Sequence, residues 1–467
     1  MIKRVHALAS TLSIIVTIVA AVSWLAAEVW WAEAAAEAAI LIYVALEVST
    51  ILRGGRIMLA ACMAATVATV FLLADPATVL SRGLSEAAFL VALLASVSLL
   101  REPAETSPLV QRCGQLMVQQ PPGRRFLVLS IGSHLIAVVL NFGVLTLLGT
   151  MVTRGNTLEA AGGDARVAAI RKQRMMTAVL RGFVLMTVWS PLSLSFAVTQ
   201  TAVPGLDWWH LLPLQIGLAM LLQVLGWLMD RYAFPRVARV PVEVHTSWLP
   251  LAQLTLLVGA VTVAAVVVAV ALSSRPVVGA MIMVPVAAIL WLTAQNWRAG
   301  LISALLLALR RFGRRMTVSM PAFRNEFVIL GGAMYLGAVL SAFISPTATA
   351  HVIAQVPLPT TLVTVILAWS VMALARYGVP QIVTVTVLGS AFADLSALGI
   401  HPLVLASGLM GAWGLSGCTT PVGAATLTVA RLAGVTSTVV ARDWNGRFVM
   451  VGALVLALWM LTLEAIV

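Results

Sequence analysis

The chain has 467 residues, of which 61% are hydrophobic and 10% are charged. Apolar content on this scale exceeds what a soluble core needs, so the composition predicts an all-α polytopic membrane protein with about 11 transmembrane helices. The net charge of +12 indicates Lys and Arg gathered in short cytoplasmic loops, rather than a nucleic-acid-binding surface. The three cysteines lack metal-type spacing and support neither a zinc site nor a disulfide framework.

The first part of the chain is predicted to place its N-terminus in the cytoplasm. Residues 1–32 combine a basic start with an apolar run, and we interpret them as an extra, uncleaved N-terminal helix. Three further spans are expected before residue 101, with the basic turn at 53–56 inside. An amphipathic, proline-interrupted segment, 101–125, should then lie on the cytoplasmic surface. These orientations predict a multi-pass protein of the inner membrane.

Residues 126–153 are apolar but are interrupted at Asn141-Phe142-Gly143. Both flanks of this stretch are basic, and a full span would move the basic loop 154–174 outside. The positive-inside rule disfavours that arrangement. The stretch is therefore predicted to be a re-entrant hairpin, with both ends on the cytoplasmic side.

A broken span is expected over residues 175–203. Pro191 lies within it, beside Ser190 and Ser193, where a proline removes a helical donor and hydroxyls can satisfy the freed backbone. A further span near 211–229 leads to a cytoplasmic linker, 233–247, which we interpret as the boundary between two halves.

The second half, 248–467, is predicted to follow the order of the first. Two spans and a surface helix precede another span near 326–345. The apolar run 361–393, with Arg376 next to Gly378 and Pro380, is predicted to be a second re-entrant hairpin. A broken span, 402–440, is interrupted at Thr419-Thr420-Pro421, and a last span closes the chain.

The two halves echo each other at their interruptions. Asn141-Phe142-Gly143 aligns with Arg376-Tyr377-Gly378, and Ser190-Pro191 aligns with Thr420-Pro421. In the expected topology an odd number of spans separates the copies. Residues 33–232 and 248–467 are therefore predicted to be two inverted repeats.

This pattern resembles the ion transporter superfamily, which includes the divalent-anion/sodium symporters. Each half carries a span, a surface helix, a hairpin and a span broken at a Ser/Thr-Pro step. The resemblance implies a homodimer in which a fixed scaffold supports a moving, elevator-type transport domain. The divalent-anion symporters carry Ser-Asn-Thr at their hairpin tips, whereas this chain has Asn141-Phe-Gly and Arg376-Tyr-Gly.

Arg376 is the strongest candidate for binding substrate. A guanidinium at a hairpin tip offers a fork of donors that matches a carboxylate, sulfonate or phosphate, and an intramembrane charge is a functional hypothesis by default. The alternative is an ordinary short span whose arginine reaches an interface. The break hydroxyls and hairpin glycines complete the candidate substrate site: Asn141, Gly143, Ser190, Ser193, Gly378, Thr419 and Thr420.

Three polar residues within the apolar segments are candidates for coupling-ion binding, namely His134, Thr199 and Thr426. A lone histidine is also often a structural partner for backbone. Glu47, the acid expected well inside a span, is equally open to packing or proton coupling, and Arg181 to an interfacial anchor.

The sequence therefore predicts a secondary active transporter of a small organic anion, coupled to Na⁺ or H⁺, and no enzyme. No cofactor is expected except Na⁺ as a possible coupling ion. The alternatives are an exporter or flippase of a lipid-linked or larger anion, or the membrane subunit of a multi-component permease with an accessory subunit. A membrane-embedded transferase would call for an acidic or metal-binding cluster, which the sequence does not display.

Overall fold

The computed structural model is predominantly helical, with no strand in the described residues, which confirms the predicted all-α class. It describes residues 2–234, 247–345, 347–349, 351, 355, 357–391 and 399–467. The predicted linker, 233–247, lies almost wholly outside this description, and so do the last two residues of the predicted hairpin 361–393.

Within the described residues, eight helices are long and apolar enough to cross a membrane, judged by length and composition. The two predicted broken spans instead form pairs of helices, none of which is among these eight. These pairs are α9 with α10, and α19 with α20. The eight long segments are Arg4–Ala27, Arg53–Leu72, Pro76–Glu105, Gly123–Leu140, Trp208–Ala233, Leu249–Ala271, Pro276–Gln295 and Gly446–Glu464.

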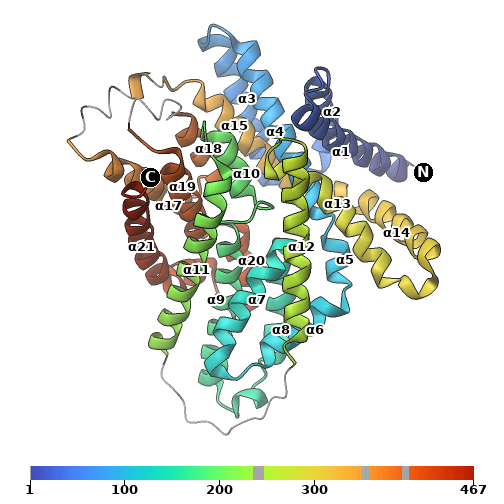
Figure 1. Cartoon of the computed structure of the whole chain (residues 1–467), viewed down its shortest axis with the longest axis vertical. Coiled ribbons are helices and arrows are strands. Elements are labelled where there is room, and N and C mark those ends of the chain that lie inside the picture. Colours follow the sequence, from blue (N-terminus) through green and yellow to red (C-terminus); the bar gives the residue numbers. More distant parts are fainter. Residues whose placement is uncertain are drawn as a thin grey trace. The chain divides into compact units, whose positions relative to one another are not determined.

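The contacts divide the chain into two compact units, drawn together in Figure 1. Unit 1 contains Met1–Ala104, Gly259–Val352 and Ile382–Ala393. Its described helices are α1 (Ile2–Ala27), α2 (Ala32–Glu47), η1 (Val48–Thr50), α3 (Arg53–Leu72), α4 (Pro76–Ser98), α5 (Arg101–Glu105), most of α12 (Leu249–Ala271), α13 (Pro276–Gln295), η3 (Trp297–Ala299), α14 (Leu301–Ala322), α15 (Arg324–Ser341) and most of α18 (Gln381–Ala391).

Helix α15 packs along α3 and α4 in unit 1. Tyr335 and Val339 of α15 form a buried cluster with Ala87 of α4. The Tyr335 hydroxyl also shares a 2.6 Å hydrogen bond with Thr66 of α3. The polar tip of this tyrosine therefore has a partner, while its ring is buried against apolar side chains.

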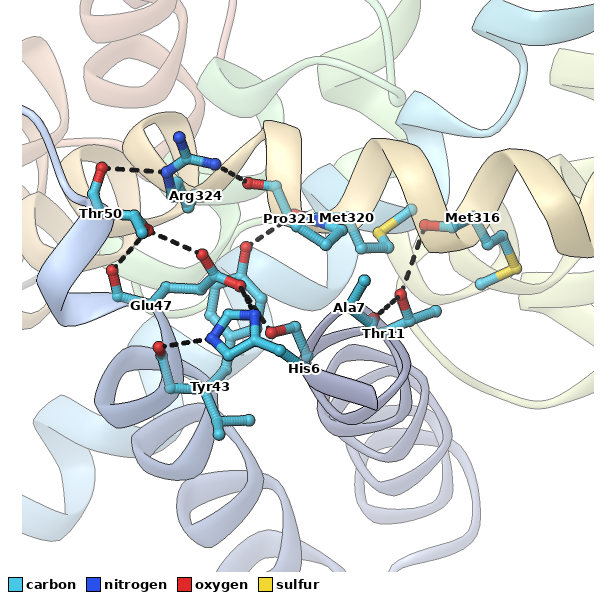
Figure 2. A network of polar contacts seen from close by, with 12 residues as sticks. His6, Ala7, Thr11, Tyr43, Glu47, Thr50, Met316, Met320, Pro321 and Arg324 are labelled. Atoms are coloured by element: carbon cyan, nitrogen blue, oxygen red, sulfur yellow. Dashed lines mark hydrogen bonds and ion pairs between the residues drawn. The ribbon is translucent and has the colours of Figure 1, made fainter. Parts of the chain in front are cut away.

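Glu47, the last residue of α2, is the centre of a network of polar contacts shown in Figure 2. Its side chain is 1% exposed and accepts hydrogen bonds from Ser10 at 2.5 Å and Thr50 at 3.0 Å. His6 of α1 lies 3.7 Å from the same carboxylate, and Arg324 donates to the Thr50 carbonyl at 3.1 Å. These contacts satisfy a buried carboxylate and join α1 to α2 and η1.

Unit 2 contains Glu105–Val258, Ile353–Gln381 and Asp394–Val467. Its described helices are α6 (Pro108–Gln119), α7 (Pro122–Leu140), α8 (Gly143–Gly155), η2 (Glu159–Ala161), α9 (Ala165–Met186), α10 (Leu194–Ala202), α11 (Trp208–Ala233), the start of α12, α17 (Thr360–Arg376), α19 (Pro402–Ser416), α20 (Ala424–Ala433), the π-helix η4 (Val439–Trp444) and α21 (Gly446–Glu464).

Helix α7 packs along α9 in unit 2, as Figure 1 shows. Gly182 of α9 faces the backbone of α7, where a side chain would collide with the Ser130 carbonyl. Nearby, the Ser133 hydroxyl of α7 donates to the Val179 carbonyl at 2.7 Å. A small residue thus permits the close approach, and an interhelical hydrogen bond holds it.

The predicted hairpins have different outcomes. Helices α7 and α8 give the first stretch, 126–153, a helix-turn-helix form with its turn at Asn141-Phe142. For the second stretch, α17 belongs to unit 2 and most of α18 to unit 1. Re-entrance and the inversion of the repeats stay predictions, because no membrane boundary is defined by these contacts.

Candidate substrate site at two helix breaks

The first break lies between α9 and α10 and is a tight turn that satisfies its own backbone. Pro191 has no N–H, but Ser190 still donates its N–H to the Met186 carbonyl at 3.1 Å. Ser193 caps α10, accepting from the Phe196 N–H at 3.3 Å and donating its hydroxyl to the Ser190 carbonyl at 2.6 Å. The predicted exchange of helical bonds for hydroxyl bonds therefore occurs at this break.

The second break, between α19 and α20, repeats the same turn. Thr420 donates its N–H to the Ser416 carbonyl at 3.1 Å, and Gly423 donates to the Thr420 carbonyl at 3.0 Å. Pro421 holds the position of Pro191, so Thr420 corresponds to Ser190 and Gly423 to Ser193. Here the hydroxyls of Thr420 and Thr426 donate to the carbonyls of Ser416 and Gly423, at 2.8 Å and 2.9 Å.

The break hydroxyls donate their protons to backbone carbonyls of the same turn, and this determines which kind of ligand their oxygens can bind. Ser193, Thr420 and Thr426 each use the O–H to satisfy a backbone carbonyl. The hydroxyl oxygens can then offer a ligand only their lone pairs. Lone pairs suit a cation or a hydrogen-bond donor rather than an anion. Thr419, by contrast, is 3.4 Å from its nearest acceptor, the Ser416 carbonyl. Buried Thr199 has no hydroxyl partner in the described part of the chain.

Glycines bring the two broken helices together at their breaks. A Cβ added to Gly417 would lie 2.9 Å from Val184 of α9, and one added to Gly414 would overlap Val188. Helix α10 packs against α19, and α20 packs against α9. Each broken helix therefore packs against the other one close to its break.

The loop after Arg376 is attached to the second break. Gly378 has a φ of +94°, and a Cβ there would lie 3.3 Å from Val422. Gln381 donates its side-chain amide to the Ser416 hydroxyl at 3.0 Å. Arg376 ends α17 with an exposed side chain, and no ion pair engages it within the described residues. Its guanidinium thus stands free on a loop held against the break.

Asn141 forms the turn between α7 and α8. Its φ of +49° and ψ of −129° are uncommon for a residue with a side chain. Phe142 packs on Phe183 of α9, with ring centroids 4.8 Å apart, and Gly143 begins α8. The turn is therefore anchored to the first broken helix, upstream of its break.

His134 positions the first break. The indole N–H of Trp189 donates to His134 Nε2 at 2.7 Å, and the two rings stack with centroids 5.8 Å apart. Since Nε2 accepts, the ring proton of a neutral His134 lies on Nδ1. Coupling-ion binding by His134 stays a prediction, as does the whole predicted substrate site.

Sequence reasoning missed Gln381, Ser416 and Trp189. Each carries a polar atom inside an apolar stretch, next to an interruption that the prolines already marked. That placement was the available signal. Their partners lie 35 to 55 residues away in the chain, so the pairing itself is a tertiary property.

The sequence matches no known family profile and no curated protein. Among solved structures, the chain is similar to the YdaH transporter of Alcanivorax borkumensis, with a TM-score of 0.52 and 13% identity, covering 88% of this chain and 98% of that one. A structure of Neisseria gonorrhoeae MtrF, described among antimetabolite efflux pumps, gives 0.46 and 13%, covering 86% and 84%. The first likeness shows that the chain has the fold of a membrane transporter.

Proposed function

We propose that the protein is a secondary active transporter of a small organic anion, coupled to Na⁺ or H⁺. The observation that carries the proposal is the attachment of the Arg376 loop to the second break, through Gln381 and Ser416. The loop that follows Arg376 is thereby held against the break, whose hydroxyl oxygens are oriented as acceptors. The shared fold with a transporter supports the same class of function.

The two parts of the site have opposite preferences. Arg376 offers donors and positive charge, which suit a carboxylate, sulfonate or phosphate. The break hydroxyls offer acceptors, and the carbonyl ends of α9 and α19 carry partial negative charge, which suit a cation. An anion and a coupling cation bound side by side would each lower the cost of burying the other.

In this proposal the polar residues of both breaks surround the substrate and the coupling ion. Thr199 and Thr426 contact the cation, and Asn141, in the turn between α7 and α8, contributes to the substrate site. Elevator-type alternating access, a homodimer and an inner-membrane location with a cytoplasmic N-terminus complete the proposal. They rest on the repeated breaks, the basic loops and the resemblance to inverted-repeat carriers.

Transport in reconstituted vesicles tests the proposal. Thermal-shift screening against carboxylates, sulfonates and phosphates, with and without Na⁺, selects the anion to be used, because a ligand that binds the folded state raises its apparent stability. Arg376→Ala should abolish uptake of that anion, and Arg376→Lys should retain part of it. Arg112→Ala, which removes an exposed arginine elsewhere in unit 2, is the control.

Uptake by Arg376→Ala at the wild-type rate would refute the assignment. A requirement for a Na⁺ or a proton gradient identifies the coupling ion. Accumulation only when the anion is loaded on the cytoplasmic side would instead favour an exporter.

A further inference from the structure

A polar cavity in unit 2 is lined by residues that lie outside both breaks. It has a volume of about 500 Å³ and is formed by α7, α9, α11, η4 and α21. Its charged lining consists of four arginines and two aspartates: Arg174, Arg181, Arg442, Arg447, Asp230 and Asp443. The excess of positive charge points to an anionic ligand.

Arg181 is the fixed centre of this lining. It is 6% exposed, and its guanidinium lies 4.2 Å from the centroid of the Phe448 ring. It donates to Asn445 Oδ1 at 3.0 Å and to the carbonyls of Trp444 and Gly226 at 3.2 Å and 3.4 Å. All three partners are neutral, so the buried charge is held in place without being cancelled.

Asp230, one of the two aspartates in the lining, already forms an ion pair with Arg174. Asp230 accepts from Arg174 with both oxygens, at 3.0 Å and 2.6 Å. The Asp230 carboxylate is thus paired with Arg174, and Arg181 has no ion-pair partner among the described residues. Asp443 is exposed on the cavity wall and is the remaining acid there.

Arg442 and Arg447 supply further guanidinium donors. Both are exposed, both line the cavity, and they flank the end of η4. A π-helical turn is uncommon and is frequent at functional sites. Here the turn ends in Trp444 and Asn445, whose oxygens hold Arg181, so one element both fixes the buried arginine and presents two open ones.

Apart from the polar side chains of Gln173 and Thr177, the rest of the wall is apolar or aromatic, formed by Phe126, Met229, Ala233, Phe234, Trp444 and Phe448. The sequence predicts the cytoplasmic edge of the membrane at each contributing segment, 173–177, 229–234 and 442–447. Basic pockets between transmembrane helices on that side suit anionic headgroups.

We propose that this cavity binds a phosphate-bearing anion, whose oxygens are held by Arg181, Arg442 and Arg447. Several arginine forks around one cavity match the several oxygens of a phosphate better than a single carboxylate. The ligand can come from two sources, the headgroup of an anionic phospholipid or a soluble phosphate. The cavity lining shares no residue with the proposed transport site, and the inference goes beyond the proposed function.

The test measures binding rather than transport. Native mass spectrometry of the purified full-length protein compares retention of phosphatidylglycerol with retention of phosphatidylcholine, and thermal shift compares inorganic phosphate with chloride at equal ionic strength. The double variant Arg442→Gln/Arg447→Gln should bind its phosphate ligand roughly tenfold more weakly or worse, the scale of one charge-assisted hydrogen bond. Arg112→Gln/Arg154→Gln removes two exposed arginines, predicted on the same membrane side, and should bind normally.

Asp443→Asn gives an outcome that damage to the fold cannot imitate. Removing this negative charge from the wall should strengthen binding severalfold. Loss in the phosphatidylglycerol arm identifies a lipid headgroup, and loss in the phosphate arm alone identifies a soluble ligand; both support the site. Equal binding by wild type, the double variant and Asp443→Asn in both arms would overturn the proposal, as would an equal loss in the control.

Discussion

The side-chain amide of Gln381 donates to the hydroxyl of Ser416 at 3.0 Å, and this bond ties the Arg376 loop to the second break. Ser416 is the last residue of α19, and its own hydroxyl proton goes to the Trp413 carbonyl at 2.7 Å. The serine oxygen therefore has a lone pair available for Gln381. A loop that carries the candidate anion ligand and a turn that carries the candidate cation ligands are thus mechanically joined.

Gln381→Ala should weaken substrate binding without removing any group that touches the substrate. Losing one neutral hydrogen bond costs about 1 kcal/mol, which corresponds to roughly a fivefold loss of apparent affinity if the loop must be ordered to bind. The Michaelis constant for uptake in vesicles is the measurement. Gln119→Ala, an exposed glutamine of α6, should leave it unchanged, and an unaltered constant in Gln381→Ala would show that the bond does not order the loop.

Gly378→Ala should destabilise the same loop. A residue with a Cβ at φ +94° is strained by about 1–2 kcal/mol, and its Cβ would press on Val422 at 3.3 Å. The apparent melting temperature of the purified protein should fall, and uptake should fall with it. Gly259→Ala, where a Cβ would meet nothing within 4 Å in the interior of α12, should be neutral or slightly stabilising.

Much of the fold could be predicted because its signals are local. The position of both breaks follows from Pro191 and Pro421 beside hydroxyl residues, and the turn at Asn141 from Asn-Phe-Gly. Helix ends were less accurate: α9 begins at Ala165, before the span predicted from 175, because its first turns are helix-forming but basic. Hydropathy identifies only the apolar part of a helix, whereas α9 continues through a basic segment before that part.

The contacts within the site could not be predicted in the same way. His134 was predicted as a candidate coupling-ion ligand or a partner for backbone, and Trp189 had no predicted role, yet they share a hydrogen bond across 55 positions. Arg181 was a candidate interfacial anchor, and nothing in the sequence indicated its partners Asn445, Trp444 and Gly226. Such pairings depend on which helices pack together, and no local pattern records that.

The bond between Trp189 and His134 should appear as a coupling energy. Trp189→Phe removes the indole N–H, and His134→Leu removes the acceptor, so each single variant leaves the other group buried without its partner. The double variant should cost less than the sum of the single ones, by about 1 kcal/mol. Chemical denaturation in detergent measures the cycle; additive losses would mean that the bond contributes nothing.

The matched control for that cycle is Trp209→Phe. Trp209 is 53% exposed and stacks on Trp208 at the start of α11, so its combination with His134→Leu should be additive. A coupling of similar size in the control would indicate a general response of the fold to losing an indole.

Substitutions of Thr426 test the two proposed roles of a break hydroxyl, which are to stabilise the turn and to offer a lone pair to the coupling ion. Its hydroxyl donates to the Gly423 carbonyl at 2.9 Å and also to the Thr420 carbonyl, so Thr426→Val leaves two buried acceptors without this donor. Each carbonyl keeps a backbone N–H donor, from Gly423 and Leu427, so the expected cost is about 1 kcal/mol of stability, with loss of Na⁺-dependent uptake if Na⁺ is the coupling ion. Thr426→Ser keeps the hydroxyl and should retain both properties, whereas Thr428→Val on the same helix should change neither. If Thr426→Val matched the wild type in stability and ion dependence while Thr428→Val did not, the second break would have to be assigned a different set of ligands.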